Sequence, residues 1–240
     1  METPHPALTC LLTFALCASL SAASGPYLGT GHEDFFGYPD CIVLENETTR
    51  VVLGSHGGRV LEYSWKGENA IYLDPDHAGW VHQPGESTID PSGGRFDIGP
   101  EMVIPSHPDL WLGEWTGKIT GPRKARLVSM IDAPTGTQLV REFELDESTS
   151  HLRCRQIIIN VSDETSEWCH WSRTFALGGG ICVIPLSEHL NRFPNDYLMY
   201  GPGPVMNFKP EDPNIRVEKG HLLITDTPTQ PMIAVDTYAG

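Results

Sequence analysis

Short runs of alternating apolar and polar residues, separated by turns, recur through most of this sequence. Arg59–Trp65 shows the pattern most clearly, because successive side chains of a strand point to opposite faces of a sheet. The chain also carries 24 Gly and 20 Pro, which favour many short strands and loops over long helices. The pattern predicts an all-β fold: a large antiparallel β-sandwich with long irregular loops and little helix.

One sandwich domain is predicted over residues 41–240, after an irregular lead-in at 24–40. Prolines recur between 74 and 124 and preclude long regular elements there, so this segment is expected to form an irregular rim or a poorly ordered insertion. A second irregular loop is expected at 191–213. Strands are predicted at 41–44, 49–53, 59–65, 70–73, 125–131, 137–145, 152–159, 168–175, 181–184, 221–225 and 232–238.

The N-terminus has the features of a secretory signal peptide over residues 1–23. Ala7–Ala18 is a short, mostly apolar run, and small residues follow it up to a predicted cleavage after Ala23. No later apolar stretch is long enough for a membrane-spanning helix. The sequence therefore predicts a secreted or periplasmic protein.

The charge of the chain limits its partners. The formal net charge is −15, with a sequence pI near 4.9, and an acidic protein repels phosphate backbones and anionic membranes. Neither nucleic acid nor membrane is expected as a partner, whereas a neutral ligand such as a sugar is compatible with this charge. The oligomeric state cannot be read from the sequence.

Four cysteines remain after the predicted signal peptide: Cys41, Cys154, Cys169 and Cys182. They allow three complete disulfide pairings, all of which stay open except that the predicted hairpin register opposes a Cys154–Cys169 bridge. There is no Cys-x-x-Cys pair. A structural zinc site is therefore not expected.

The stretch from Asn160 to Gly180 contains the candidate for chemistry. Its polar residues separate two β-type runs and are typical of a β-hairpin. Alternation places Trp168, His170 and Ser172 on one face, and Trp171 with Phe175 on the other. We expect His170 to be reachable from a cleft and the second face to pack into the core, with a structural histidine at the rim of the core as the alternative.

Three motifs in this order resemble the galactose mutarotase-like (aldose 1-epimerase-like) superfamily. The first is the meander that begins Gly57-Gly58-Arg59, and the second is Gly93-Gly94-Arg95-Phe96-Asp97-Ile98-Gly99-Pro100-Glu101. The third is Asn160-Val161-Ser162-Asp163 followed by His170 and an aromatic residue. The resemblance covers residues 41–240 and implies the supersandwich fold of that superfamily.

The resemblance also implies a carbohydrate ligand and no cofactor or metal. In mutarotation an acid protonates the ring oxygen of the sugar while a base removes the proton of the anomeric hydroxyl, and a histidine titrates in the right range for the acid. On this interpretation His170 is the general acid, and Glu101 is the in-chain candidate for the base. The expected sugar contacts are Arg59, Arg95, Trp168 and Ser172.

Other interpretations of these residues remain open. For Arg59, a strand-end side chain that reaches solvent is the more common arrangement, and Arg95 and Glu101 are equally compatible with a solvated loop. The glutamate that serves as base near the C-terminus of the family has no match before Gly240. The sequence therefore suggests either a fragment, or a non-catalytic carbohydrate-binding or interaction module on the same sandwich.

Overall fold

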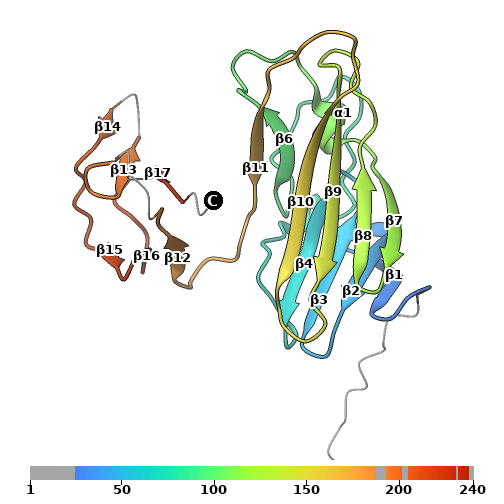
Figure 1. Ribbon diagram of the computed structural model, residues 1–240, viewed down its shortest axis with the longest axis horizontal. Coiled ribbons are helices and arrows are strands. Elements are labelled where there is room, and N and C mark those ends of the chain that lie inside the picture. The colour runs from blue at the N-terminus through green and yellow to red at the C-terminus, as the bar shows by residue number, and fades with distance from the viewer. Residues whose placement is uncertain (1–24, 188–192, 202–204, 231, 238–240) are drawn as a thin grey trace, which may run out of the picture. The chain divides into compact units, whose positions relative to one another are not determined.

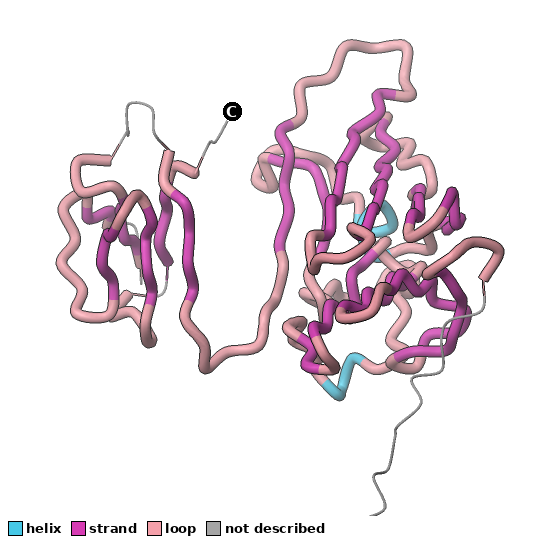
Figure 2. The backbone as a smooth tube through the Cα atoms, turned by 60° about the horizontal axis from the view of Figure 1, so that its bottom comes forward, coloured by secondary structure: helices cyan, strands magenta, loops and turns pink. Residues whose placement is uncertain are grey.

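The computed structural model describes residues 25–187, 193–201, 205–230 and 232–237, and the predicted signal peptide lies outside them. Strands make up nearly all of the regular structure of these residues, as Figure 2 shows, with one short helix, α1 (Pro108–Leu112), and one 3₁₀ turn, η1 (Pro75–His77). The prediction of an all-β antiparallel protein is confirmed. The chain divides into two compact units, Met1–Phe175 and Ala176–Gly240, within the stretch that the sequence suggested as one domain. They are called here the N-terminal and C-terminal units.

Two antiparallel sheets build most of the N-terminal unit (Figure 1). The first has the order β1-β2-β3-β4-β5, with β1 (Thr30–Phe35), β2 (Tyr38–Glu45), β3 (Thr49–Gly54), β4 (Arg59–Trp65) and β5 (Glu68–Asn69). The second has the order β10-β9-β8-β7, with β7 (Thr116–Gly121), β8 (Lys124–Val128), β9 (Thr137–Leu145) and β10 (Leu152–Asn160). A two-stranded ladder joins β6 (Arg95–Gly99) to β11 (Cys169–Arg173).

The main core lies between the sheets. Side chains from β2, β3, β6, β8 and β9 form one buried cluster, which includes Leu44, Leu53, Phe96, Leu127 and Phe143. A second cluster, with Tyr38, Val43 and Val52, covers the opposite face of the first sheet. Because the first sheet is buried on both faces, β2 and β3 contain nearly continuous apolar runs.

The predicted hairpin of the two runs around residue 163 is wrong. β10 pairs with β9. β11 pairs instead with β6, which begins at Arg95, more than fifty residues before β11. β11 nevertheless runs beside β10 in Figure 1, and side chains of Gln156 and Ser172 connect the two strands. Polar turn residues indicate that the chain reverses, but not which strand it pairs with next.

Two other segments contain more regular structure than predicted. The expected irregular lead-in at 24–40 contains β1 and the start of β2, and the expected rim at 74–124 contains β6, α1 and β7. β1 was missed because its exposed edge carries polar residues, and β6 because Arg95 and Asp97 interrupt an otherwise buried strand.

The C-terminal unit contains two three-stranded antiparallel sheets around a small core of its own. Their orders are β12-β16-β15 and β14-β13-β17, with β12 (Cys182–Pro185), β13 (Tyr197–Tyr200), β14 (Met206–Asn207), β15 (Ile215–Glu218), β16 (His221–Ile224) and β17 (Met232–Val235). The expected loop at 191–213 therefore contains two short strands. The core of this unit includes Tyr197, Met199, Ile215 and Leu222.

Candidate functional site

His170 lies on β11, on the face of the β6–β11 ladder that it shares with Phe96 and Ile98. It is opposite Ile98 in the ladder, and its ring centroid lies 5.4 Å from that of Phe96. Its Nε2 hydrogen-bonds the side-chain oxygen of Gln156 on β10, so Nε2 carries a proton. Burial, with a smaller effect from Arg141, lowers the pKa of His170, which favours the neutral imidazole. The residue as a whole is still exposed, as the sequence predicted.

Glu101 does not meet His170. Its carboxylate accepts a hydrogen bond of 2.7 Å from Arg95 and lies 3.6 Å from Arg173. Both arginines are opposite one another in the β6–β11 ladder, on the face that alternates with His170. The two residues predicted as acid and base therefore occupy opposite faces of the ladder.

The four predicted sugar contacts are dispersed. Arg59 is buried, and its nitrogens donate to the carbonyls of His56 and Ser92 and to the hydroxyl of Tyr38, which is a structural role. Arg95 is buried beneath Glu101, with its guanidinium 4.1 Å from the ring of Trp111.

Trp168 and Ser172 do share the face of His170. Trp168 is half-buried against the main core and donates its indole N–H to the carbonyl of Thr135 at 3.3 Å. Ser172 receives a hydrogen bond of 3.2 Å from Gln156. Trp171 and Phe175 were expected in the core, but both are only half-buried and neither belongs to a core cluster. Both tryptophans are half-buried, and it is Trp168 rather than Trp171 that packs against the main core.

Asp97 and His107 form a buried ion pair that was not singled out as a site. The Nε2 of His107 lies 2.9 Å from Asp97, and its Nδ1 lies 2.6 Å from the carbonyl of Pro105. Burial alone would lower the pKa of His107, but the bonds to Asp97 and Pro105 raise it. Since both ring nitrogens face acceptors, the imidazolium fits this position, and it ties the residue before α1 to β6.

A cleft of about 320 Å³ opens in the N-terminal unit, and none of the residues predicted as a site lines it. Two histidines and two carboxylates line it, together with small hydroxyl residues and an apolar floor. The lining residues are His32, Pro39, Asp40, Ile42, Leu53, Ser55, His56, Glu114, Trp115, Thr116, Gly117 and Leu127. We call this the His56 cleft.

The position of His56 depends on the two glycines that follow it. Both Gly57 and Gly58 have positive φ, of 72° and 56°, where L side chains are strained. A Cβ on Gly58 would lie 2.5 Å from the ring of Trp115. Only glycine allows the loop after β3 to lie this close to the segment before β7.

Backbone pairing then places His56 across from Glu114. The two residues form an antiparallel bridge, and hydrogen bonds of 2.8 Å flank it, from Gly57 to Gly113 and from Trp115 to Ser55. Directly opposite residues in such a bridge have their Cβ atoms about 5 Å apart on one face. An imidazole and a carboxylate therefore project side by side into the cleft.

The electrostatic setting of His56 suits proton exchange. Burial, followed by the nearby charge of Arg59, lowers its pKa, while Glu114 acts in the opposite direction. At neutral pH the ring is therefore mainly neutral and has both a donor and an acceptor nitrogen. The second histidine of the cleft, His32, lies 3.0 Å from the carboxylate of Asp40.

The sequence held one signal for this cleft. His56-Gly57-Gly58 places a histidine directly before a pair of glycines, and such a pair favours a sharp turn of the backbone. Glu114 had no comparable signal, because only the tertiary fold brings it to His56.

Several kinds of site find no support in the described residues. The described residues contain no group of three or more His, Cys, Asp or Glu side chains placed to bind a metal ion. The cysteines at 41, 154, 169 and 182 form no disulfide bond with one another. No helix in the part of the chain that the structure describes has the length and apolar character needed to cross a membrane. No known protein family, characterised protein or solved structure matches this chain.

Proposed function

We propose that the N-terminal unit is a galactose mutarotase-like sandwich that binds a small carbohydrate in the His56 cleft. The observation that carries this proposal is the bridge between His56 and Glu114 above an apolar floor. Ligand pockets typically combine apolar walls with a few convergent polar groups, and the volume of about 320 Å³ suits a ligand of a few rings at most.

A sugar fits the chemistry of the lining. Its hydroxyls need both donors and acceptors, which the imidazoles, carboxylates and hydroxyls at the rim supply. Its C–H faces need apolar surface, which Ile42, Leu53 and Leu127 supply in the floor. A metal ion would leave the apolar side chains of the cleft without a partner, and a purely apolar ligand would leave the polar ones without a partner.

Aldose 1-epimerase activity is the catalytic form of this proposal. Anomer interconversion needs one group that gives a proton to the ring oxygen and another that takes one from the anomeric hydroxyl. His56 and Glu114 together supply such groups. The ring of His170 instead hydrogen-bonds the side-chain amide of Gln156, which is neither an acid nor a base at neutral pH. We therefore place the acid–base pair at His56 and Glu114.

The second candidate is a non-catalytic binding module on the same fold. The separation of Glu101 from His170 favours it, because the acid–base pair inferred from the resemblance is not assembled. The two candidates share the ligand class and differ only in turnover.

Calorimetric titration with a panel of neutral monosaccharides tests binding, and polarimetry on the sugars that bind tests turnover. We expect His56→Gln to weaken binding about tenfold or more, because it removes the ring that lies across from Glu114. His170→Gln is the matched control and leaves binding within about twofold. Equal losses in both variants, or no binding of any sugar, would contradict the proposal, and binding without faster anomer interconversion would select the non-catalytic module.

Export is proposed alongside this function. The signal-like segment 1–23 supports it, although that segment lies outside the described residues. N-terminal sequencing of the protein recovered from a secreting host should begin at Ser24. An intact Met1 on the mature protein would argue against export by this route.

A further inference from the structure

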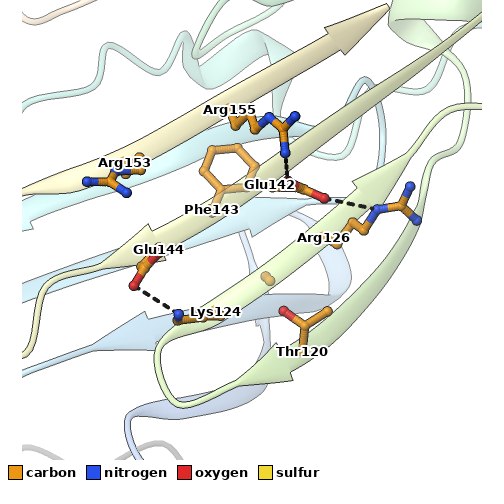
Figure 3. A pocket seen from close by; sticks show the side chains of 9 residues that line it. Thr120, Lys124, Arg126, Glu142, Phe143, Glu144, Arg153 and Arg155 are labelled. Carbon is orange, nitrogen blue, oxygen red and sulfur yellow. Dashed lines mark hydrogen bonds and ion pairs between the residues drawn. The ribbon is translucent and has the colours of Figure 1, made fainter. Parts of the chain in front are cut away.

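The outward face of the second sheet carries a concentration of positive charge that the proposed function does not use. Register places two rows of side chains across its strands, one of Lys118, Arg126, Glu142 and Arg155, and one of Lys124, Glu144 and Arg153. Thr120, where the register of β7 shifts, lines the same hollow. Figure 3 shows most of these side chains around a shallow hollow of about 340 Å³. We call these two rows the outer face.

This concentration is unusual for so acidic a chain. The outer face holds five of the sixteen Lys and Arg residues but only two of the thirty-one Asp and Glu residues. It therefore has a formal charge of +3 in a chain of net charge −15. Repulsion from the rest of the surface weakens contact with large polyanions, but a thin anionic ligand that touches only this face avoids that repulsion.

The cations are available to a ligand. Lys124 lies 2.9 Å from Glu144, and Glu142 lies 3.5 Å from Arg126 and 3.4 Å from Arg155. These pairs are exposed, and exposed pairs contribute at most about 1 kcal/mol each, so they exchange readily for other partners. Arg153 is also exposed, across from Glu144 in the ladder.

The two glutamates indicate what kind of anion fits. They lie between cations in each row, as Figure 3 shows, so a ligand that bridges the cations also meets carboxylates. A carboxylate attracts hydroxyl donors and repels further anionic oxygens. The face suits a ligand that alternates acidic groups with hydroxyls, and suits a bare phosphate chain much less.

We propose that the outer face binds acidic oligosaccharides, with the uronate or sulfate groups on Lys and Arg and the sugar hydroxyls on Glu142 and Glu144. This site is independent of the His56 cleft, because the two hollows share no lining residue. Paired rows about 7 Å apart along the strands offer contacts to successive acidic sugars.

Calorimetry with tetragalacturonate, at low and at physiological salt, tests the proposal. We expect Arg126→Gln/Arg155→Gln to weaken binding about tenfold or more, since two charge-assisted contacts are lost. The matched control is Lys66→Gln/Arg216→Gln, which removes two exposed cations elsewhere and changes the affinity by about twofold at most. A neutral glucose tetrasaccharide should bind this face much more weakly than tetragalacturonate.

Three outcomes would overturn the proposal. They are no binding of tetragalacturonate, an equal loss in the control variant, and tighter binding of tripolyphosphate or oligothymidylate than of tetragalacturonate. Loss of neutral-sugar binding in His56→Gln with retained tetragalacturonate binding would separate the two sites. If neutral sugars bind in the His56 cleft and tetragalacturonate does not bind at all, the acidic-oligosaccharide proposal is rejected and the proposed function is unaffected.

Discussion

At the scale of single residues, His107 makes the stability of the N-terminal unit depend on pH. It is buried with Asp97, and its two hydrogen bonds raise its pKa above the unfolded value of about 6.5. Its contribution to stability is therefore complete below about pH 6.5 and is lost as the pH rises through the folded-state pKa.

We predict that His107→Gln destabilises the protein more at about pH 6 than at about pH 8.5. Urea denaturation of wild type and variant at both pH values measures this difference, and the comparison cancels the background from His56 and His170, whose lowered pKa values act in the opposite direction. A difference that grows toward alkaline pH would show that the neutral ring is the form held here.

Gly58 sets the geometry of the cleft at the same scale. Gly58→Ala combines a positive φ with a Cβ 2.5 Å from Trp115, so we expect a loss of about 3 kcal/mol or more in the free energy of unfolding. Gly67→Ala is the matched control. It also has positive φ but meets nothing within 4 Å, and should cost about 1 kcal/mol. Equal losses on denaturation would mean that the contact with Trp115 is unimportant.

At the scale of elements, β11 differs most from expectation. Its faces are set by β6, so His170 and Ser172 lie over Ile98 and Phe96, and Trp168 extends this face onto the main core. We predict that Trp168→Ala costs about 3 kcal/mol, more than Trp171→Ala. Thermal denaturation of both variants measures the difference, and a larger loss for Trp171→Ala would restore the orientation that the sequence suggested.

A strand could be predicted from the sequence where its own residues alternate between apolar and polar, and not where its burial depends on the rest of the fold. β4 and β9 match their predicted ranges, Arg59–Trp65 and Thr137–Leu145, because their pattern follows the alternation of faces. β6 could not be recognised, because two charged residues, Arg95 and Asp97, are buried within it, which the alternation of apolar and polar residues does not predict. The candidate site was missed because the bridge from His56 to Glu114 exists only once the two layers meet.

At the scale of the whole molecule, the chain divides into two compact units, Met1–Phe175 and Ala176–Gly240. Each has its own buried cluster, and the cleft and the outer face both belong to the first. We predict that a chain of residues 25–175 folds cooperatively on its own and keeps the sugar affinity of the full protein. Circular dichroism with calorimetry measures both properties, and an unfolded or non-binding fragment would show that the second unit is required.

The central claim is that the ligand site is the His56 cleft rather than the surroundings of His170. Nitrogen-15 correlation spectra, recorded during titration with a sugar that binds, test it most directly. The account predicts shifts concentrated at Ser55, His56, Glu114 and Thr116, with little change on β10 and β11. Shifts centred on Gln156, His170 and Ser172, with the His56 cleft unaffected, would contradict it.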